Sequence, residues 1–290
     1  MAKNILAKIE EEYNGLSKGH KRIADFICGN LDDAAFMTAA VLGKKVDVSE
    51  STVVRFSTSL GYPGYPEMQK ELREISKRHL TSVQRMEAAY KRHSGSDMLD
   101  AALLSDLDNI KATRESISRS DFTGSVEAIN SAKRIYILGV RSAAPLAAFA
   151  AFYMNYVYDN VTLVDASGPD EIFEQMYRIS DKDVCIAISF PRYSNQTLNA
   201  LKFASGRGAV IISVTDSEMS PIAAYATYLL TAKSSTVSFV DSLTAPLSLI
   251  NALIASAAEE RKQEVRSNLS ELESIWDEYH VYRKNDGEDK

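Results

Sequence analysis

The sequence contains few of the side chains that build disulfide frameworks and metal sites. It has only two cysteines among 290 residues, Cys28 and Cys185, and they lie far apart in apolar segments. Two thiols in such positions exclude a disulfide framework and a thiolate metal centre. The histidines are too scattered to supply metal ligands; they are His20, His79, His93 and His280. We therefore expect no metal and no other cofactor.

The sequence also lacks an apolar run as long as a membrane span. The longest apolar stretch, residues 143–157, contains Pro145 and Asn155. A membrane helix needs about 20 apolar residues, and this stretch is shorter. It also lies far from the N-terminal region where a secretory signal would stand. We therefore expect a cytoplasmic protein that does not contact a membrane.

Composition and charge narrow the protein class further. Hydrophobic residues make up 45% and charged residues 25% of the chain, which is typical of globular domains and excludes disordered and collagen-like chains. Residues 1–95 carry 15 Lys and Arg against 12 Asp and Glu, whereas residues 96–290 carry 18 against 27. The mildly basic first part is compatible with nucleic-acid binding, although many solvated helical surfaces have a similar excess.

The first 95 residues carry helix signals and no strand-like run. Ser17, Thr38 and Ser49 are each placed to cap a helix. Gly61, followed by Pro63, ends the helix that starts at Ser49. The two short helices after Thr38 and Ser49 have the length and turn spacing of a helix-turn-helix. We therefore predict an all-helical domain over residues 1–78.

The second helix of a helix-turn-helix enters the major groove of DNA with its N-terminal residues toward bases and phosphates. Here those residues are Ser49, Glu50, Ser51, Thr52 and Arg55. Arg55 suits a guanine edge or a phosphate, and the hydroxyls suit phosphate oxygens. We expect Val53, Val54 and Phe56 to face the core. The alternative on residue types alone is an ordinary capped surface helix.

From Lys133 onward, short apolar runs alternate with segments of helix length. Nearly continuous apolar character is typical of parallel strands that are buried on both faces. The alternation predicts a doubly wound, flavodoxin-like parallel sheet, in which ligands bind beyond the carboxyl ends of the strands. The expected strands are residues 134–140, 161–164, 184–190, 209–215 and 228–231.

Two loops that follow predicted strands carry polar side chains. After the first strand, Arg141 and Ser142 open a helix whose N-terminus suits a phosphate. Arg141 and Ala144 stand where a dinucleotide fingerprint would need glycines, so that fingerprint is absent. After the third strand, the hydroxyl-rich segment 189–197 leads into another helix. Both loops are expected to border one crevice.

The stretch "VSESTVVRFSTSLGYPGYPEMQKELREI" resembles the N-terminal DNA-binding domain of the RpiR family of bacterial transcriptional regulators. The resemblance covers roughly residues 3–78. It implies that the helix capped by Ser49 is the recognition helix. The resemblance implies that Ser51, Thr52 and Arg55 contact operator DNA. We include the capping residue Ser49 in this group.

The remainder of the chain resembles the sugar isomerase (SIS) domain that follows the helix-turn-helix in this family. The quoted segments include "RIYILGVRSAAPLA" and "DVCIAISFPRYSNQT". The common SIS pattern Ser-x-Ser-Gly-x-Thr holds a sugar phosphate; Ser189 matches its first serine and Ser194 its threonine. Pro191 replaces the second serine and Arg192 the glycine. The resemblance and the loops together predict ligand contacts from Arg141, Ser142, Ser189, Arg192, Tyr193, Ser194 and Thr197.

The two departures from the SIS pattern change the chemistry of the loop. Proline removes one hydroxyl and one N–H donor, and arginine adds a fixed positive fork. Our hypothesis is that Arg192 neutralises part of the charge of the anion and that Tyr193 narrows the pocket or stacks on the ligand. The alternative is that Arg192 pairs with Asp216 or Asp241 in a pocket without a ligand.

We expect a one-component regulator in which a sugar phosphate or related metabolite modulates operator binding. The expected parts are a helix-turn-helix domain (1–78), a linker (79–107), a SIS domain (108–262) and a C-terminal helix and tail (263–290). Symmetric operators are bound by pairs of DNA-binding domains, so we expect a homodimer or homotetramer assembled through residues 98–117 and the tail helix.

The competing class of protein is a SIS-fold isomerase, which would need a general base. The candidates are Asp165, Glu171, Glu174 and Asp241.

Overall fold

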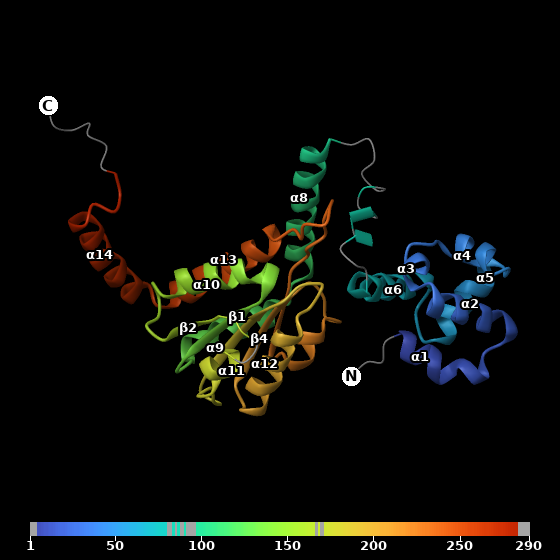
Figure 1. Ribbon diagram of the computed structural model, residues 1–290, viewed down its shortest axis with the longest axis horizontal. Coiled ribbons are helices and arrows are strands. Elements are labelled where there is room, and N and C mark those ends of the chain that lie inside the picture. Colours follow the sequence, from blue (N-terminus) through green and yellow to red (C-terminus); the bar gives the residue numbers. More distant parts are fainter. Residues whose placement is uncertain are drawn as a thin grey trace. The chain divides into compact units, whose positions relative to one another are not determined.

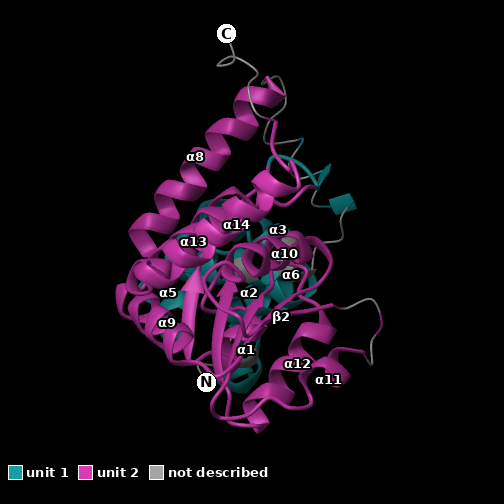
Figure 2. Cartoon of the chain, turned by 90° about the vertical axis from the view of Figure 1, so that its left-hand side faces the viewer, with its two compact units in different colours: residues 1–96, 237–239 teal, residues 97–236, 240–290 magenta. Residues whose placement is uncertain are grey.

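The structure is a computed structural model in which the chain forms two compact units (Figure 2). Unit 1 comprises residues 1–96 with 237–239, and unit 2 comprises residues 97–236 with 240–290. A helical first unit followed by an α/β second unit confirms the predicted fold class. The residues that the structure describes are 5–79, 83–84, 86–87, 90, 97–165, 168 and 171–283. Part of the predicted linker, including Ser94, Gly95 and Ser96, lies outside them.

Unit 1 is built from helices around one apolar core. They are α1 (Ile5–Glu12), α2 (Lys18–Gly29), α3 (Leu31–Ala34), α4 (Ala39–Lys45), α5 (Glu50–Ser59) and α6 (Tyr65–His79). The predicted caps are confirmed, because the side chains of Ser17, Thr38 and Ser49 accept backbone N–H bonds at the starts of α2, α4 and α5. The core includes Phe56, Ile27, Met68 and Leu72.

One prediction about the core of unit 1 is wrong. Val53 and Phe56 of α5 are fully buried, as expected, but Val54 is 38% exposed. Successive residues of a helix are turned by about 100° from each other, so Val54 cannot share the inward face that Val53 and Phe56 occupy. The apolar side chain at position 54 therefore belongs to the outer surface of α5.

Unit 2 contains a five-stranded sheet in which all neighbouring strands are parallel. The strand order β2-β1-β3-β4-β5 is that of a flavodoxin-like doubly wound fold. The strands are β1 (Ile135–Gly139), β2 (Val161–Val164), β3 (Val184–Ile188), β4 (Val210–Thr215) and β5 (Tyr228–Thr231). All five lie within two residues of their predicted bounds, because buried parallel strands have continuous apolar sequences.

Helices cover both faces of the sheet (Figure 1). One face packs against α9 (Arg119–Ser131), α10 (Ala144–Met154) and α13 (Thr244–Glu260), and the other against α11 (Glu171–Met176) and α12 (Asn195–Gly206). At Gly139, a Cβ atom would lie 2.6 Å from the carbonyl oxygen of Ala143 and 2.9 Å from the Cβ of Ala147. Only glycine therefore allows α10 to approach the end of β1 this closely.

Two further helices flank the sheet layers of unit 2. Helix α8 (Met98–Ser116) packs against α13, and α14 (Lys262–Glu278) follows α13 after a break at Arg261. Helix α14 contains no buried residue among those described. Helix α14 begins one residue before the expected C-terminal helix and tail (263–290), and a break at Arg261 separates it from α13. Within the described ranges, no helix has the length and apolar character needed to cross a bilayer.

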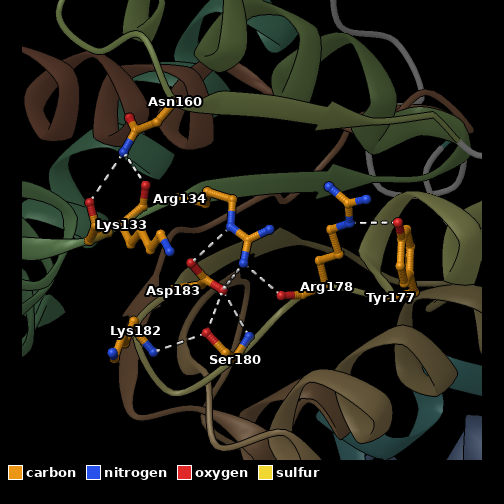
Figure 3. A network of polar contacts seen from close by, with 9 residues as sticks. Lys133, Arg134, Asn160, Tyr177, Arg178, Ser180, Lys182 and Asp183 are labelled. Atoms are coloured by element: carbon orange, nitrogen blue, oxygen red, sulfur yellow. Dashed lines mark hydrogen bonds and ion pairs between the residues drawn. The ribbon is translucent and has the colours of Figure 1, made fainter.

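A polar network joins the amino ends of β1 and β3 (Figure 3). The side chain of Asp183 is fully buried and accepts bonds of 3.2 Å from Nε and Nη2 of Arg134. Its Oδ2 also accepts 2.8 Å bonds from the backbone N and the Oγ of Ser180. Because these partners satisfy the buried carboxylate, the network can hold the two strand starts together at the edge opposite their carboxyl ends.

Candidate functional site

The four residues predicted to contact DNA lie together at the start of α5. Ser49 caps the helix, and its Oγ is hydrogen-bonded to Ser51 Oγ at 2.9 Å and to Thr52 Oγ1 at 2.8 Å. Arg55 Nη2 donates to Thr52 Oγ1 at 3.3 Å. The side chains of Ser49, Ser51 and Arg55 are exposed. The first two turns of α5 therefore present three hydroxyls and one guanidinium as a connected group.

The turn between α4 and α5 is tightly packed. A Cβ at Gly43 would lie 2.8 Å from the carbonyl oxygen of Val48, and the N–H of Val48 donates to the carbonyl of Gly43 at 2.9 Å. Asp47 takes a left-handed conformation with φ 56°. These contacts fix the direction in which α5 leaves the turn, as a helix-turn-helix requires. Exposed Lys44 and Lys45 end α4 nearby in the chain.

His20 is a neighbour of this surface, although in the sequence it is only one of four scattered histidines. Its ring packs edge-on against Phe56 with centroids 5.5 Å apart, and a Cβ at Gly19 would lie 3.5 Å from Thr52 Cγ2. The first turn of α2 therefore lies against α5. Burial, together with the positive charge of Arg55, lowers the pKa of His20. No local sequence signal links His20 to α5, because α2 and α5 meet only in the folded domain.

In unit 2, the two predicted loops lie beside the topological switch point. The chain passes from β1 outward to β2 and returns to β3 on the other side of β1, so β1 and β3 are the strands between which ligands bind in this topology. Residues Gly139 and Ile188, which end these strands, are in register with each other. The loops that start after them therefore leave the same edge of the sheet.

The loop after β1 exposes its two candidate side chains. Arg141 has φ 59°, in the left-handed region, and both Arg141 and Ser142 are exposed. The N–H of Ala143 donates to the carbonyl of Val140 at 3.2 Å and closes a short turn before α10. The loop thus presents a guanidinium and a hydroxyl at the start of a helix, where an anion is favoured.

The loop after β3 divides into exposed and buried parts. Arg192 is exposed, and Ser194 caps α12 by accepting the N–H of Gln196 at 3.2 Å. Ser189 is buried, and its backbone N–H donates to the carbonyl of Val214 at 3.0 Å. Thr197 is fully buried, and its hydroxyl has no hydrogen-bond partner among the described residues. Arg192 and Ser194 are therefore the more accessible candidates.

Tyr193 connects this loop to the end of β4. Its hydroxyl donates to Asp216 Oδ1 at 2.7 Å. Thr215 Oγ1 lies 3.3 Å from the same carboxylate oxygen and 2.8 Å from Ser220 Oγ. From the sequence, Asp216 is expected only as a possible partner of Arg192. The contact with Tyr193 could not be read from the sequence, because it depends on how the two loops meet.

The candidate catalytic carboxylates are on the surface. The side chains of Asp165, Glu171 and Glu174 are exposed, and Asp241 is half-buried, whereas a general base tuned by burial needs a dry site. Burial raises the pKa of the Cys185 thiol to about 12, so it is not a nucleophile near neutral pH. The described residues contain no cluster of three or more side chains that could ligate a metal.

Comparison with known proteins agrees with both units. Residues 3–78 match the helix-turn-helix domain of the rpiR family, and residues 128–256 match the SIS domain. An uncharacterized helix-turn-helix transcriptional regulator of Haemophilus influenzae is 29% identical over 78% of this chain and 79% of its own length. The transcriptional regulator HexR of Escherichia coli is 27% identical over 79% of this chain and 77% of its own length.

Solved structures show the same fold. The Vibrio vulnificus NanR protein, complexed with ManNAc-6P, is 21% identical with a TM-score of 0.60, over 97% of this chain and all of that one. The sugar isomerase domain of an RpiR transcription factor from Sphaerobacter thermophilus is 24% identical with a TM-score of 0.59, over 61% of this chain and 98% of that one. This chain belongs to the RpiR family of helix-turn-helix transcriptional regulators, with a C-terminal SIS domain.

Proposed function

We propose that this regulator binds operator DNA through α5 and that a sugar phosphate or a related sugar metabolite in the SIS crevice modulates this binding. One observation carries the proposal. The chain combines a hydrogen-bonded Ser49-Ser51-Thr52-Arg55 group in a helix-turn-helix with two polar loops at the switch point of a SIS sheet. The first arrangement suits a DNA groove, and the second suits an anionic ligand.

The proposed ligand contacts come from both switch-point loops. Arg141 and Ser142 from the first loop, with Arg192 and Ser194 from the second, supply positive charge and hydroxyls for a phosphate. Ser189, Tyr193 and Thr197 complete the proposed site. The bound ManNAc-6P in the related NanR structure supports a sugar phosphate as the class of ligand.

We propose further that the chain acts as a homodimer or homotetramer and not as an enzyme. The surface of α8 supports assembly, since Leu99, Leu103 and Leu107 are between 55% and 67% exposed, and stripes of exposed leucine of this kind mark protein contacts. The surface positions of Asp165, Glu171 and Glu174 give no support to isomerase chemistry, and curated relatives are named as transcriptional regulators.

The DNA part of the proposal is tested with Arg55→Ala. We expect affinity for a duplex from upstream of the chain's own gene to fall by about 1–3 kcal/mol, because a bidentate base contact is worth that much. Fluorescence anisotropy at several salt concentrations measures it. Arg207→Ala, which removes an exposed arginine of unit 2, is the matched control and should bind like the wild type. Unchanged site-specific binding by Arg55→Ala would refute the assignment of α5.

The ligand part is tested by thermal shift with pairs of compounds. N-acetylmannosamine 6-phosphate, glucose 6-phosphate and fructose 6-phosphate are each compared with the unphosphorylated sugar. A ligand at 100 times its Kd stabilises the folded state by about 2.7 kcal/mol. We expect at least one phosphate to raise Tm while its neutral partner does not. If only the neutral sugars raised Tm, the proposal that this crevice binds a phosphate group would be wrong.

A further inference from the structure

The inner face of α8 is polar, although a helix that packs on a domain usually turns an apolar face inward. Asn109 and Thr113 are 3% and 7% exposed, whereas Leu103 and Leu107 of the same helix are more than half exposed. Asp106, Asn109 and Thr113 are spaced at intervals of three and four and therefore share one face. Hydrogen bonds rather than apolar contacts thus hold much of this face in place.

The partners of this polar face lie in the segment between β5 and α13, which runs beside α8 (Figure 1). Asn109 Nδ2 donates to the carbonyl of Ser235 at 2.8 Å, and the N–H of Ser235 donates back to Asn109 Oδ1 at 3.1 Å. The N–H of Lys233 donates to Thr113 Oγ1 at 2.9 Å. We call residues 232–236 the strap, because they tie α8 to the end of β5.

Asp106 extends the same attachment toward α13. Its two carboxylate oxygens accept hydrogen bonds from Ser242 Oγ at 2.5 Å and from Thr244 Oγ1 at 2.8 Å. Several separate hydrogen bonds therefore attach α8 to the strap and to the start of α13. Loss of one or two of them would shift the balance between positions of α8 without unfolding the domain.

The other side of the strap is attached to the end of β4 at the crevice. The N–H of Ala232 donates to the carbonyl of Thr215 at 2.7 Å, and Lys233 Nζ lies 3.5 Å from the carbonyl oxygen of Asp216. The carboxylate of Asp216 accepts the hydroxyl of Tyr193 at 2.7 Å. A continuous series of bonds therefore leads from Tyr193 in the loop after β3 to Thr113 on α8.

We propose that Tyr193, Asp216, the strap and Thr113 are positioning residues that transmit occupancy of the crevice to α8. Helix α8 is the first element of unit 2 and is joined along the chain, through residues 80–97, to the helix-turn-helix unit. A change in its position changes the attachment of the DNA-binding unit. This inference rests on the proposed function, since it needs a ligand in the crevice.

The hydroxyl of Tyr193 is the group through which a bound ligand would start this change. A tyrosine hydroxyl has one proton to donate, and in this structure it goes to Asp216. A phosphate oxygen is a strong charged acceptor, so a phosphate at the loop after β3 competes with Asp216 for that proton. Loss of the Tyr193 bond removes one of the contacts that fix the Asp216 side chain and so alters the segment on which the strap is anchored.

The test compares Thr113→Val with Thr113→Ser, and adds Tyr193→Phe. Valine has nearly the shape of threonine but cannot accept the N–H of Lys233, whereas serine keeps the acceptor. For each protein, DNA affinity is measured by anisotropy with and without N-acetylmannosamine 6-phosphate, glucose 6-phosphate or fructose 6-phosphate, and the affinity for the sugar phosphate is measured by calorimetry. Unchanged melting curves without ligand establish that each variant folds. Tyr193→Phe, which keeps the ring of a half-buried residue, covers the case in which Thr113→Val does not fold.

In the wild type and Thr113→Ser, we expect a sugar phosphate to change DNA affinity by about 5-fold or more, the usual range of coupling between two sites. In Thr113→Val, which lies outside the proposed ligand site, we expect this change to fall below about 2-fold while the sugar phosphate still binds like the wild type. In Tyr193→Phe, measured at a saturating concentration of sugar phosphate, we expect the same loss of coupling together with weaker sugar-phosphate binding, because the hydroxyl is also a proposed ligand contact. Equal coupling in all four proteins would overturn the proposed path and leave the proposed function intact. A wild type that binds DNA but no sugar phosphate would overturn both.

Discussion

At the scale of the residue, Arg192 offers the sharpest test of the ligand site. It stands where the common SIS pattern has glycine, and its side chain is exposed at the switch point. Hydrogen bonds to charged groups contribute about 1.5–3 kcal/mol, so Arg192→Ala should weaken the binding of a sugar phosphate by about 10- to 150-fold. Calorimetry measures the Kd.

Arg192→Lys is the matched comparison for Arg192→Ala. Arg192→Lys keeps the charge but loses the planar fork, so its affinity should lie between those of the wild type and Arg192→Ala. The melting temperature without ligand should change little in either variant, because the side chain is on the surface. Ligand binding by Arg192→Ala at wild-type strength would remove Arg192 from the site.

Sequence reasoning located individual residues best where local geometry decides their place. Ser49, Ser51, Thr52 and Arg55 lie within two turns of one helix, so their proximity follows from helical spacing. The bond from Tyr193 to Asp216 joins residues 23 positions apart, and no periodicity predicts it. Val54 was misplaced because an apolar side chain was taken as a sign of burial, whereas single exposed apolar residues are normal.

Among the elements, the predicted strands were accurate, and the predicted start of the C-terminal helix lies within one residue of the start of α14. Continuous apolar runs identify buried parallel strands, and their order follows from the flavodoxin-like topology that the alternation predicts. In the tail, the helical spacing of apolar residues continues on both sides of Arg261. That spacing could not reveal that α13 ends at Glu260 and α14 begins at Lys262.

The network at the amino ends of β1 and β3 is expected to stabilise the fold without taking part in ligand binding. Asp183→Ala removes a buried carboxylate and leaves Arg134 and the hydroxyl and N–H of Ser180 without it. We expect a loss of about 3 kcal/mol in the free energy of unfolding, measured in urea, because breaking a buried ion pair leaves its partners unsatisfied.

The neighbouring change Asp181→Ala, at an exposed position, is the control and should alter the free energy of unfolding by less than about 0.5 kcal/mol. The folded fraction of Asp183→Ala should still bind a sugar phosphate, since the network lies at the sheet edge opposite the switch point. Stability equal to the wild type would mean that the network does not hold the strands together.

In the whole molecule, α8 is the element through which we propose that the DNA-binding unit and the ligand-binding unit are coupled. Exposed leucines on one side of α8 are the proposed assembly surface, and its polar face is attached to the strap. If α8 moves when a ligand occupies the crevice, the two DNA-binding units of a dimer change their spacing on a symmetric operator. The affinity for the operator then changes as well.

We propose that the binding of operator DNA and the binding of a sugar phosphate are thermodynamically linked. The most direct measurement is a complete binding cycle on the wild-type protein: the Kd for operator DNA with and without saturating sugar phosphate, and the Kd for the same sugar phosphate with and without saturating DNA. Linkage requires the two affinities to change by the same factor, and we predict a factor of about 5 or more. Tight binding of both, with neither affinity altered by the other, would contradict the account.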